Sequence, residues 1–367
     1  MLRCATSSRS FHQCLAVNGC RNYAAQVQKR LDVSERNTPP QPMIFATHPV
    51  ADPYISLAPE LSSLRRNLSG ILGSAHPSLK DLAEHYFADS RNLFRSSAIL
   101  LFARATNSTS PGWTHAVLDA QREDKEELDL ALSCPDVLHY WNPNMPDHAE
   151  SFDTVFTLRN PPLPLQPRIN PHLCPTTNGL LPSQFRLAQI MEMIHVASVL
   201  HDQITPNPAD TANKLSILGG DFLLGRACAA LSRLGSDCVV ELIASVISNL
   251  SEGRVVASPS WDDFIKNMYL KEGSLVAKGA RSAVVLAGGT SAMQDIAYTF
   301  GRNFGMAMQL VEEASRGDER CWEAAHVYAR RALQVIHCVP DSVHRQSLEL
   351  FVDTLLDPAR KWISVES

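Results

Sequence analysis

Apolar residues recur at three- and four-residue steps along most of the chain, which is the spacing of one face of a helix. Leu57, Leu61, Leu64 and Leu68 are the first such set. The same periodicity predicts further helices over residues 79–105, 185–200, 214–231, 239–250, 261–286, 293–313, 321–336 and 342–356. No segment shows the sustained alternation of a strand. Helix after helix with short connections predicts an all-α bundle.

A proline-rich stretch from about residue 106 to residue 183 interrupts the helical pattern. Its proline density excludes a long regular element, because proline breaks helices and sheets. A segment of this length is either functional or disordered, and we expect a surface insertion that is mostly disordered. The predicted organisation is a mitochondrial presequence and linker over residues 1–50, then one helical domain over 51–367 that carries the insertion.

The N-terminal segment is basic and contains no acidic residue before Asp32, and serine is frequent at residues 7–10. This composition is typical of a mitochondrial transit peptide, although a disordered basic tail has a similar composition. Residues 21–24 (RNYA) resemble the cleavage site of a matrix protease. We therefore expect the protein in the mitochondrial matrix, with a mature chain that begins near Ala24.

The charge of the chain narrows the classes of partner. The formal net charge is -5 and the pI is about 6.2. A nucleic-acid surface needs a basic excess, so we expect no nucleic-acid partner. No apolar run approaches the ~18 residues of a membrane span, which leaves only peripheral contact with a membrane open.

Cysteine and histidine give no sign of a metal site. The chain has nine cysteines, and none forms a C-x-x-C pair. Their scattered positions favour reduced thiols over a disulfide framework. His195 and His201 lie six residues apart and do not share a helix face, so we expect both to be structural.

Four segments carry more specific information than the periodicity does. They are residues 187–202 (LAQIMEMIHVASVLHD), 214–227 (KLSILGGDFLLGRA), 271–275 (KEGSL) and 300–311 (FGRNFGMAMQLV). Together they resemble the trans-polyprenyl diphosphate synthase family, and within it the non-catalytic chain of heteromeric decaprenyl or solanesyl diphosphate synthases. The resemblance extends over about 55–105 and 185–356. It implies an isoprenoid-synthase-like helical bundle.

The resemblance also implies a chemistry of diphosphates. In the family, an allylic diphosphate ionises, and isopentenyl diphosphate attacks the resulting carbocation. Magnesium ions neutralise the departing pyrophosphate by bridging its oxygens to carboxylates. Two D-D-x-x-D motifs on facing helices supply these carboxylates, with the first and last aspartate one helical turn apart.

The first of these motifs is degenerate in this chain. It aligns with Asp202, Gln203 and Pro206, so only the first carboxylate is kept. One amide and one proline do not hold magnesium as two carboxylates do. The stretch with a diphosphate-binding arginine that usually follows the motif is absent as well.

The second motif aligns with Glu312, Glu313 and Arg316. The two glutamates still offer oxygens to a metal, but Arg316 reverses the charge at the last position. At spacings of four and three residues Arg316 is placed to pair with both glutamates, and three separately solvated side chains are the alternative. The candidate metal ligands of the chain are therefore Asp202, Glu312 and Glu313.

The positions that bind diphosphates in the family are partly kept. Arg95 is present, but the lysine three residues before it is replaced by Asn92. Lys271 is present and is followed by Glu272 in place of a threonine, and Arg254 stands where the family has an acidic residue. Arg95 and Lys271 are thus the candidate substrate-binding residues.

Three functions fit these observations. The one we favour is the partner subunit of a synthase that makes the isoprenoid side chain of ubiquinone. The chain is then inactive alone, and a catalytic chain completes a heterodimer or heterotetramer. Magnesium binds mainly to that partner, and isoprenoid diphosphates are the substrates of the complex. The alternatives are a synthase that works alone with fewer metals and a prenyl-synthase-like scaffold or lipid-binding protein.

Overall fold

The structure is a computed structural model, and it describes residues 53–72, 85–87, 93–122, 179–205, 211–256 and 258–356. These residues form helices and turns, and no strand occurs among them. All of them belong to one unit of the chain, Thr47–Ser367. The prediction of an all-α fold is confirmed.

The helices follow one another in an order close to the predicted one. They are α2 (Pro53–Leu72), α4 (Phe94–Asn107), α5 (Trp113–Arg122), α9 (Pro182–Asp202), α10 (Thr211–Ser232), α11 (Asp237–Val255), α12 (Trp261–Met268), the π-helical turn η3 (Tyr269–Gly273), α13 (Ser274–Leu286), α14 (Ser291–Ser315), α15 (Glu319–Ile336) and α16 (Val343–Leu355).

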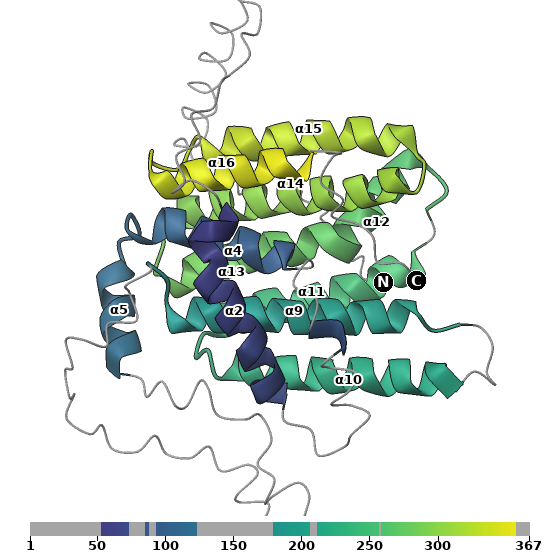
Figure 1. Ribbon diagram of the computed structural model, residues 1–367, viewed down its shortest axis with the longest axis horizontal. Coiled ribbons are helices and arrows are strands. Elements are labelled where there is room, and N and C mark those ends of the chain that lie inside the picture. Colours follow the sequence, from purple (N-terminus) through teal and green to yellow (C-terminus); the bar gives the residue numbers. More distant parts are fainter. Residues whose placement is uncertain are drawn as a thin grey trace, which may run out of the picture. The chain divides into compact units, whose positions relative to one another are not determined.

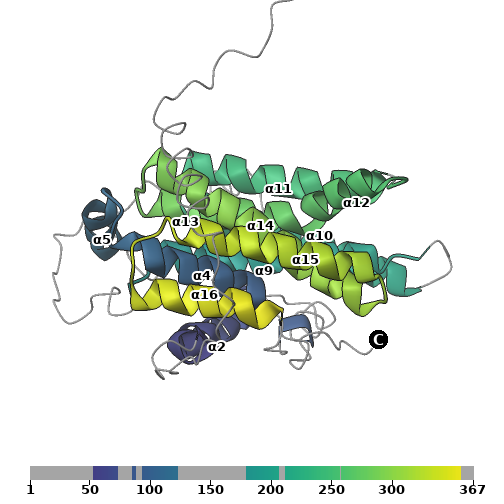
Figure 2. The same cartoon turned by 90° about the horizontal axis from the view of Figure 1, so that it is seen from above.

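Helix α13 lies at the centre of the bundle, in contact with α4, α9, α11 and α14. Helix α14 packs along α13 and also along α15. Figure 1 shows α15 and α16 on one side of this centre and α10 on the opposite side, where α10 packs against α9. Figure 2 shows α11 and α12 along the edge away from α2.

Local sequence signals explain where several helices begin. Ser236, Thr290 and Ser342 are the N-caps of α11, α14 and α16, and each side chain accepts a hydrogen bond from the backbone N–H three residues further on. Such caps satisfy N–H groups that have no partner inside the helix. Pro182 begins α9, where the missing N–H of proline costs nothing.

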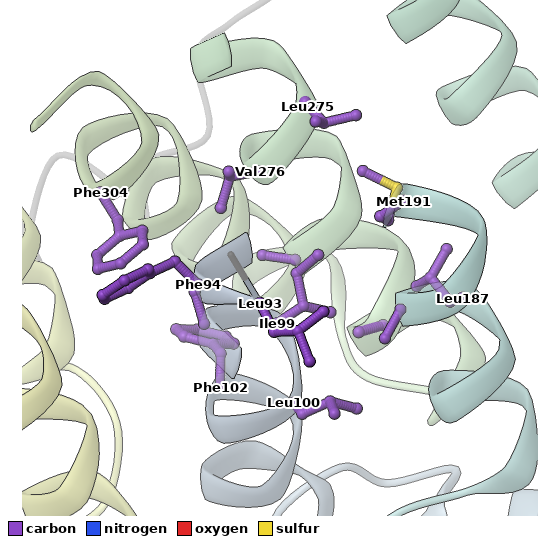
Figure 3. Packing of buried hydrophobic residues seen from close by; sticks show 14 of the residues in the cluster. Leu93, Phe94, Ile99, Leu100, Phe102, Leu187, Met191, Leu275, Val276 and Phe304 are labelled. Atoms are coloured by element: carbon purple, nitrogen blue, oxygen red, sulfur yellow. The ribbon is translucent and has the colours of Figure 1, made fainter. Parts of the chain in front are cut away.

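Stacked phenylalanines form part of the hydrophobic core. The ring centroids of Phe102 and Phe300 lie 4.9 Å apart, and those of Phe304 and Phe351 lie 5.3 Å apart. Figure 3 shows Phe94 and Phe102 of α4 on the side that faces Phe304 of α14. Burial of one side chain of this size contributes roughly 1.5–3 kcal/mol. The stack therefore joins α4, α14 and α16.

The helix predicted over residues 79–105 has different bounds in the structure. Of its first half, only residues 85–87 and 93 are described, and α4 runs from Phe94 to Asn107. Every residue of α4 is buried. A helix buried on all sides has no polar face, so its periodicity does not mark its ends.

The single helix predicted over residues 261–286 is divided into α12, η3 and α13. A π-helical turn inserts one residue into the regular helix. Gly273 in η3 packs against Gly305 of α14 so closely that a Cβ on Gly305 would lie 3.2 Å from Gly273 Cα. The contact joins two helices that are distant in the sequence. The hydrophobic periodicity of residues 261–286 therefore does not reveal that the predicted helix is divided.

The first residues of the expected insertion are helical and contact the end of α13. The backbone N–H of Gly112 donates to the carbonyl oxygen of Gly288 at 3.1 Å, and α5 follows directly. Gly288 has a φ of 68° at the end of α13, a backbone conformation that favours glycine and commonly ends a helix. Residues 1–52 and 123–178, which contain the predicted presequence and most of the insertion, lie outside the described residues.

Candidate functional site

Several helix ends meet at one end of the bundle (Figure 1). The C-terminal ends of α9 and α11 are joined there by an ion pair, and the N-terminal end of α4 is joined to η3 by another. The C-terminal part of α14 lies close enough for the carboxylate of Glu312 to act on the charge of Arg95 in α4. The described candidate residues of both motifs are at this end of the bundle.

Asp202, the last residue of α9, is paired with an arginine of α11. Arg254 Nε donates to Asp202 Oδ1 at 2.7 Å. Arg254 Nη2 donates to the carbonyl oxygen and to the hydroxyl of Ser198, at 2.7 and 2.6 Å. The one carboxylate kept from the first motif therefore already has a cation of its own chain.

Gln203, at the second position of the first motif, also has a hydrogen-bond partner. The hydroxyl of Tyr86 donates to Gln203 Oε1 at 2.9 Å. Beyond it, the backbone N–H of Thr205 donates to Asn213 Oδ1, and Asn213 Nδ2 donates back to the carbonyl oxygen of Thr205, both at 2.9 Å. Pro206 lies outside the described residues.

Arg316, at the C-terminal end of α14, binds both glutamates of the second motif. Its Nη2 lies 2.9 Å from Glu312 Oε1, and its Nη1 lies 2.5 Å from Glu313 Oε1. The pairing predicted from the spacing is confirmed. Because Arg316 is exposed, these pairs contribute little to stability, but they place a cation of the same chain against one oxygen of each carboxylate.

Arg95 and His195 converge on Glu272 in the interior. Arg95 Nε donates to Glu272 Oε2 at 2.8 Å, and His195 Nδ1 lies 3.3 Å from Glu272 Oε1. Burial alone would raise the pKa of Glu272, but the charges of Arg95 and His195 lower it to about 2. The residue that replaces the family threonine thus holds a candidate substrate-binding arginine.

Lys271, the other candidate substrate-binding residue, faces a different helix. A Cβ on Gly253 of α11 would lie 3.0 Å from Lys271 Cγ, so the lysine stem packs on the end of α11 beside Arg254. The adjacent Glu272 points to Arg95 of α4 instead. The two candidates therefore contact different neighbours.

His201 lies one residue before the first motif, and its ring is held against α10. Its Nε2 atom lies 3.4 Å from Asp221 Oδ1, and a Cβ on Gly220 would come within 2.2 Å of the same atom. Gly220 thus leaves room for the imidazole ring, which a larger residue would displace. This packing agrees with the structural role that the spacing favoured.

The sequence pointed to Arg254 and Glu272 as departures from the family, but not to their partners. It also missed Tyr86 and Ser198. A signal was present, because each changed residue has the charge opposite to that of a residue kept from the family. Arg254 pairs with the kept Asp202, and Glu272 pairs with the kept Arg95.

Comparison with known proteins identifies the family. A family model described as "Polyprenyl synthetase" matches residues 171–314. The chain is 30% identical over 329 residues to "Hexaprenyl pyrophosphate synthase, mitochondrial" of Saccharomyces cerevisiae, in an alignment that covers 71% of this chain and 68% of the relative. The chain belongs to the polyprenyl synthetase family.

Other members of the polyprenyl synthetase family match over parts of their length. "Probable hexaprenyl pyrophosphate synthase, mitochondrial" of Yarrowia lipolytica is 34% identical over 291 residues, which cover 72% of this chain and 62% of the relative. The corresponding Neurospora crassa protein is covered to 59%, so the chain spans less than two thirds of both. "Decaprenyl-diphosphate synthase subunit 1" of Schizosaccharomyces pombe is 34% identical over 161 residues, 38% of this chain and 43% of the relative.

A solved structure supports the same polyprenyl synthetase fold. The polyprenyl synthase of Caulobacter crescentus, complexed with calcium and isoprenyl diphosphate, superposes with a TM-score of 0.59 at 17% identity. The superposition covers 84% of this chain and 98% of the Caulobacter chain. The predicted isoprenoid-synthase-like helical bundle is therefore confirmed.

Polyprenyl synthases typically use magnesium, which binds to carboxylate oxygens. The question is therefore whether the described carboxylates at both motif positions are available as ligands. One oxygen of Asp202 and one of each α14 glutamate already contact arginines. Within the described ranges, no group of three or more His, Cys, Asp or Glu side chains is arranged to hold a metal ion.

Proposed function

We propose that the chain is the catalytically deficient partner subunit of a trans-polyprenyl diphosphate synthase. The complex makes the isoprenoid side chain of ubiquinone in the mitochondrial matrix. Two observations support this setting: the relatives are named as mitochondrial hexaprenyl pyrophosphate synthases, and the N-terminal segment is basic and acid-free before Asp32.

One observation carries the proposal: arginines of the same chain form ion pairs with the carboxylates left at both motif positions. Arg254 pairs with Asp202, and Arg316 pairs with Glu312 and Glu313. Magnesium needs carboxylate oxygens and is repelled by an adjacent guanidinium of the same sign of charge. These residues do not fit the metal. Catalysis therefore belongs to a second chain with both motifs intact, which binds magnesium and the isoprenoid diphosphates.

Helix α10 offers a surface for that second chain. It packs mainly against α9, and Leu215, Ile217 and Leu218 are 41–51% exposed. On the same helix, Gly225 has open space around its Cβ position and Cys228 is exposed. Exposed apolar side chains next to small residues suit close packing of helices, and a two-fold arrangement accommodates two unlike chains.

Over Ala212–Ser232 the same helix is long and apolar enough to span a membrane. Charged residues interrupt its apolar sequence, so it contains no continuous apolar run of that length. Such helices also occur in soluble cores, and α10 is packed along α9. We therefore assign its apolar surface to a protein partner. Contact with a membrane surface is an alternative that co-purification and vesicle-binding measurements on a variant of α10 distinguish.

Reconstitution of prenyl transfer tests the proposal. The purified chain is incubated with farnesyl diphosphate, labelled isopentenyl diphosphate and magnesium, with and without a catalytic chain that carries both aspartate-rich motifs. We expect no long product from this chain alone and long product from the pair. Asp202→Ala in this chain should leave turnover unchanged, whereas the matching aspartate change in the catalytic chain should abolish it.

Two results would contradict the partner role. Robust turnover by this chain alone would favour a synthase that works with fewer metals. Full activity and normal product length of the catalytic chain without this protein would favour a scaffold or lipid-binding role. Because both results use the same assay, one set of reactions separates the three functions.

A further inference from the structure

Lys278 is a partly buried lysine of α13 that is held by two neutral side chains of α11. Its Nζ donates to Ser245 Oγ at 2.8 Å. The amide nitrogen of Asn249 donates to the carbonyl oxygen of Ser245 at 3.2 Å, and in this orientation the amide oxygen accepts from Lys278 Nζ at 3.0 Å. Among the described residues, no carboxylate forms an ion pair with Lys278.

These hydrogen bonds suit a neutral amine. Ser245 Oγ donates its own hydrogen to the carbonyl oxygen of Leu242 at 2.6 Å, so it can only accept from Lys278. The amide oxygen of Asn249 also only accepts. A neutral amine has two N–H groups and one lone pair. The two acceptors match the two N–H groups, which leaves the lone pair directed away from both helix partners.

The surroundings of Lys278 favour loss of its proton. Burial lowers the pKa of its amine, because the charged form is less well solvated between α11 and α13. A neighbouring carboxylate would oppose this effect, but both side chains that bind the amine are neutral. Lys278 keeps some contact with solvent, whereas Lys266 of α12 is fully on the surface. A desolvated amine of this kind is a better nucleophile than an exposed lysine.

We propose that Lys278 is a site of acylation by acyl thioesters. The lone pair of Nζ attacks the carbonyl carbon of the thioester, so that an N–C bond forms and the C–S bond breaks. The proton that the nitrogen loses goes to the departing thiolate, and the products are an amide on Lys278 and a thiol. The step is complete with these two reactants. The inference goes beyond the proposed function and does not rest on it.

Acylation would weaken the contact between α11 and α13. The amide nitrogen of an acylated lysine carries one N–H and no charge. Ser245 Oγ and Asn249 Oδ1 can then no longer both accept a hydrogen bond from Lys278. A partly buried acceptor without its donor lowers stability. We therefore expect the acylated chain to melt at a lower temperature than the unmodified chain.

Acetylation of the full chain with acetyl-coenzyme A tests the inference. The folded chain and the urea-unfolded chain are incubated at the same pH, and acetylation of each lysine is followed by peptide mass spectrometry. Folding should speed the acetylation of Lys278 about threefold or more, because more of its amine is neutral in the folded chain. Lys266 should react at nearly the same rate in both states. A smaller gain for Lys278 would overturn the inference.

Asn249→Asp tests the role of the neutral surroundings. A carboxylate beside Nζ stabilises the ammonium form, so the gain of Lys278 on folding should disappear. Ser251→Asp is the matched control, because Ser251 is an exposed residue of α11 whose hydroxyl donates to the carbonyl oxygen of Ile247 in the same helix. This control should leave the gain unchanged. An equal loss in both variants would overturn the inference.

Lys278→Arg covers the case in which Asn249→Asp does not fold. Arginine keeps the positive charge but is not acylated, because its guanidinium stays protonated. Treatment with acetyl-coenzyme A should lower the melting temperature of the wild-type chain and leave that of Lys278→Arg unchanged. Equal decreases would assign the effect to other lysines and overturn the inference. An unchanged melting temperature of a wild-type chain acetylated at Lys278 would count against it as well.

Discussion

Two arginines supply positive charge where related enzymes use a metal. Arg254 binds Asp202 and also bridges to Ser198 one turn earlier in α9, and Arg316 binds the two glutamates of α14. A guanidinium is always charged and donates hydrogen bonds in fixed directions. These side chains can therefore hold the bundle end together without magnesium or a diphosphate.

Glu272 should make the stability of the chain depend on acid pH. Its pKa is about 2 when folded, below the usual 4.5, so the carboxylate stabilises the fold fully above about pH 4.5 and progressively less as the pH falls toward 2. We expect the difference in unfolding free energy between wild type and Glu272→Gln to shrink over this window. Urea titrations at a series of pH values measure it.

Glu252→Gln provides the reference for this pH series, because Glu252 is an exposed residue of α11. Its difference from wild type should stay nearly constant between pH 6 and pH 2.5, by the usual weak contribution of exposed charges. A difference for Glu272→Gln that is equally independent of pH would contradict the ion pair with Arg95.

Among the helices, a buried amide pair joins α4, α9 and α13 at the end of the bundle opposite the motifs. Gln184 and Asn107 exchange two hydrogen bonds of 2.8 Å, and Gln184 Nε2 also donates to the carbonyl oxygen of Ala283. Both side chains are almost fully buried. Buried polar networks of this kind specify how helices meet, because every unpaired member is costly.

Gln184→Leu should lower the unfolding free energy by about 3 kcal/mol. The substitution leaves buried groups of Asn107 and Ala283 without their partner, at about 1–3 kcal/mol each. Chemical denaturation followed by circular dichroism measures the change. Gln346→Leu, at an exposed position of α16, should stay within about 0.5 kcal/mol of wild type. Similar small effects for both would show that the amide pair does not hold the helices.

Described residues on both sides of the proline-rich segment contact the bundle, so a deletion that tests the insertion has to keep them. Replacement of residues 125–176 by a short Gly/Ser linker should preserve helical circular dichroism and a cooperative melt, since the contacts of Gly112 with Gly288 and of Gly179 with Asn107 are kept. Removal of all of 106–183 should destabilise the fold because it deletes these contacts. Loss of folding in the shorter deletion would mean that the removed segment packs on the bundle.

Among the described residues, α10 carries three exposed large apolar side chains, whereas α15 and α16 carry one each. Leu218 is 51% exposed, so a charged residue there leaves the core intact. A dimer of unlike chains would bury this surface. The partner role and the surface of α10 are thus two parts of one hypothesis.

Leu218→Glu should abolish co-purification with the catalytic chain while the melting temperature of the isolated chain changes little. Val343→Glu, on α16 at 45% exposure, should leave co-purification unchanged. Alkylation of the exposed thiol of Cys228 should slow in the complex. Retained co-purification together with loss of vesicle binding by Leu218→Glu would assign α10 to a membrane surface instead.

The amino-acid sequence by itself was sufficient for the fold class, the approximate helices and the loss of motif carboxylates. Helical periodicity and residue identity are local properties, so Gln203, Pro206 and Arg316 can be recognised without coordinates. The pairing of Arg316 with its two glutamates was also accessible, since residues three and four apart lie on one helix face.

Only the tertiary structure decided which charges meet across helices. Asp202 and Arg254 are 52 residues apart in sequence, and Arg95 and Glu272 are 177 apart. Their contact depends on how α9, α11, α4 and η3 are packed, and η3 packs closely against Gly305 of α14. Such long-range contacts follow from packing of the whole core and leave no periodic signal in the chain.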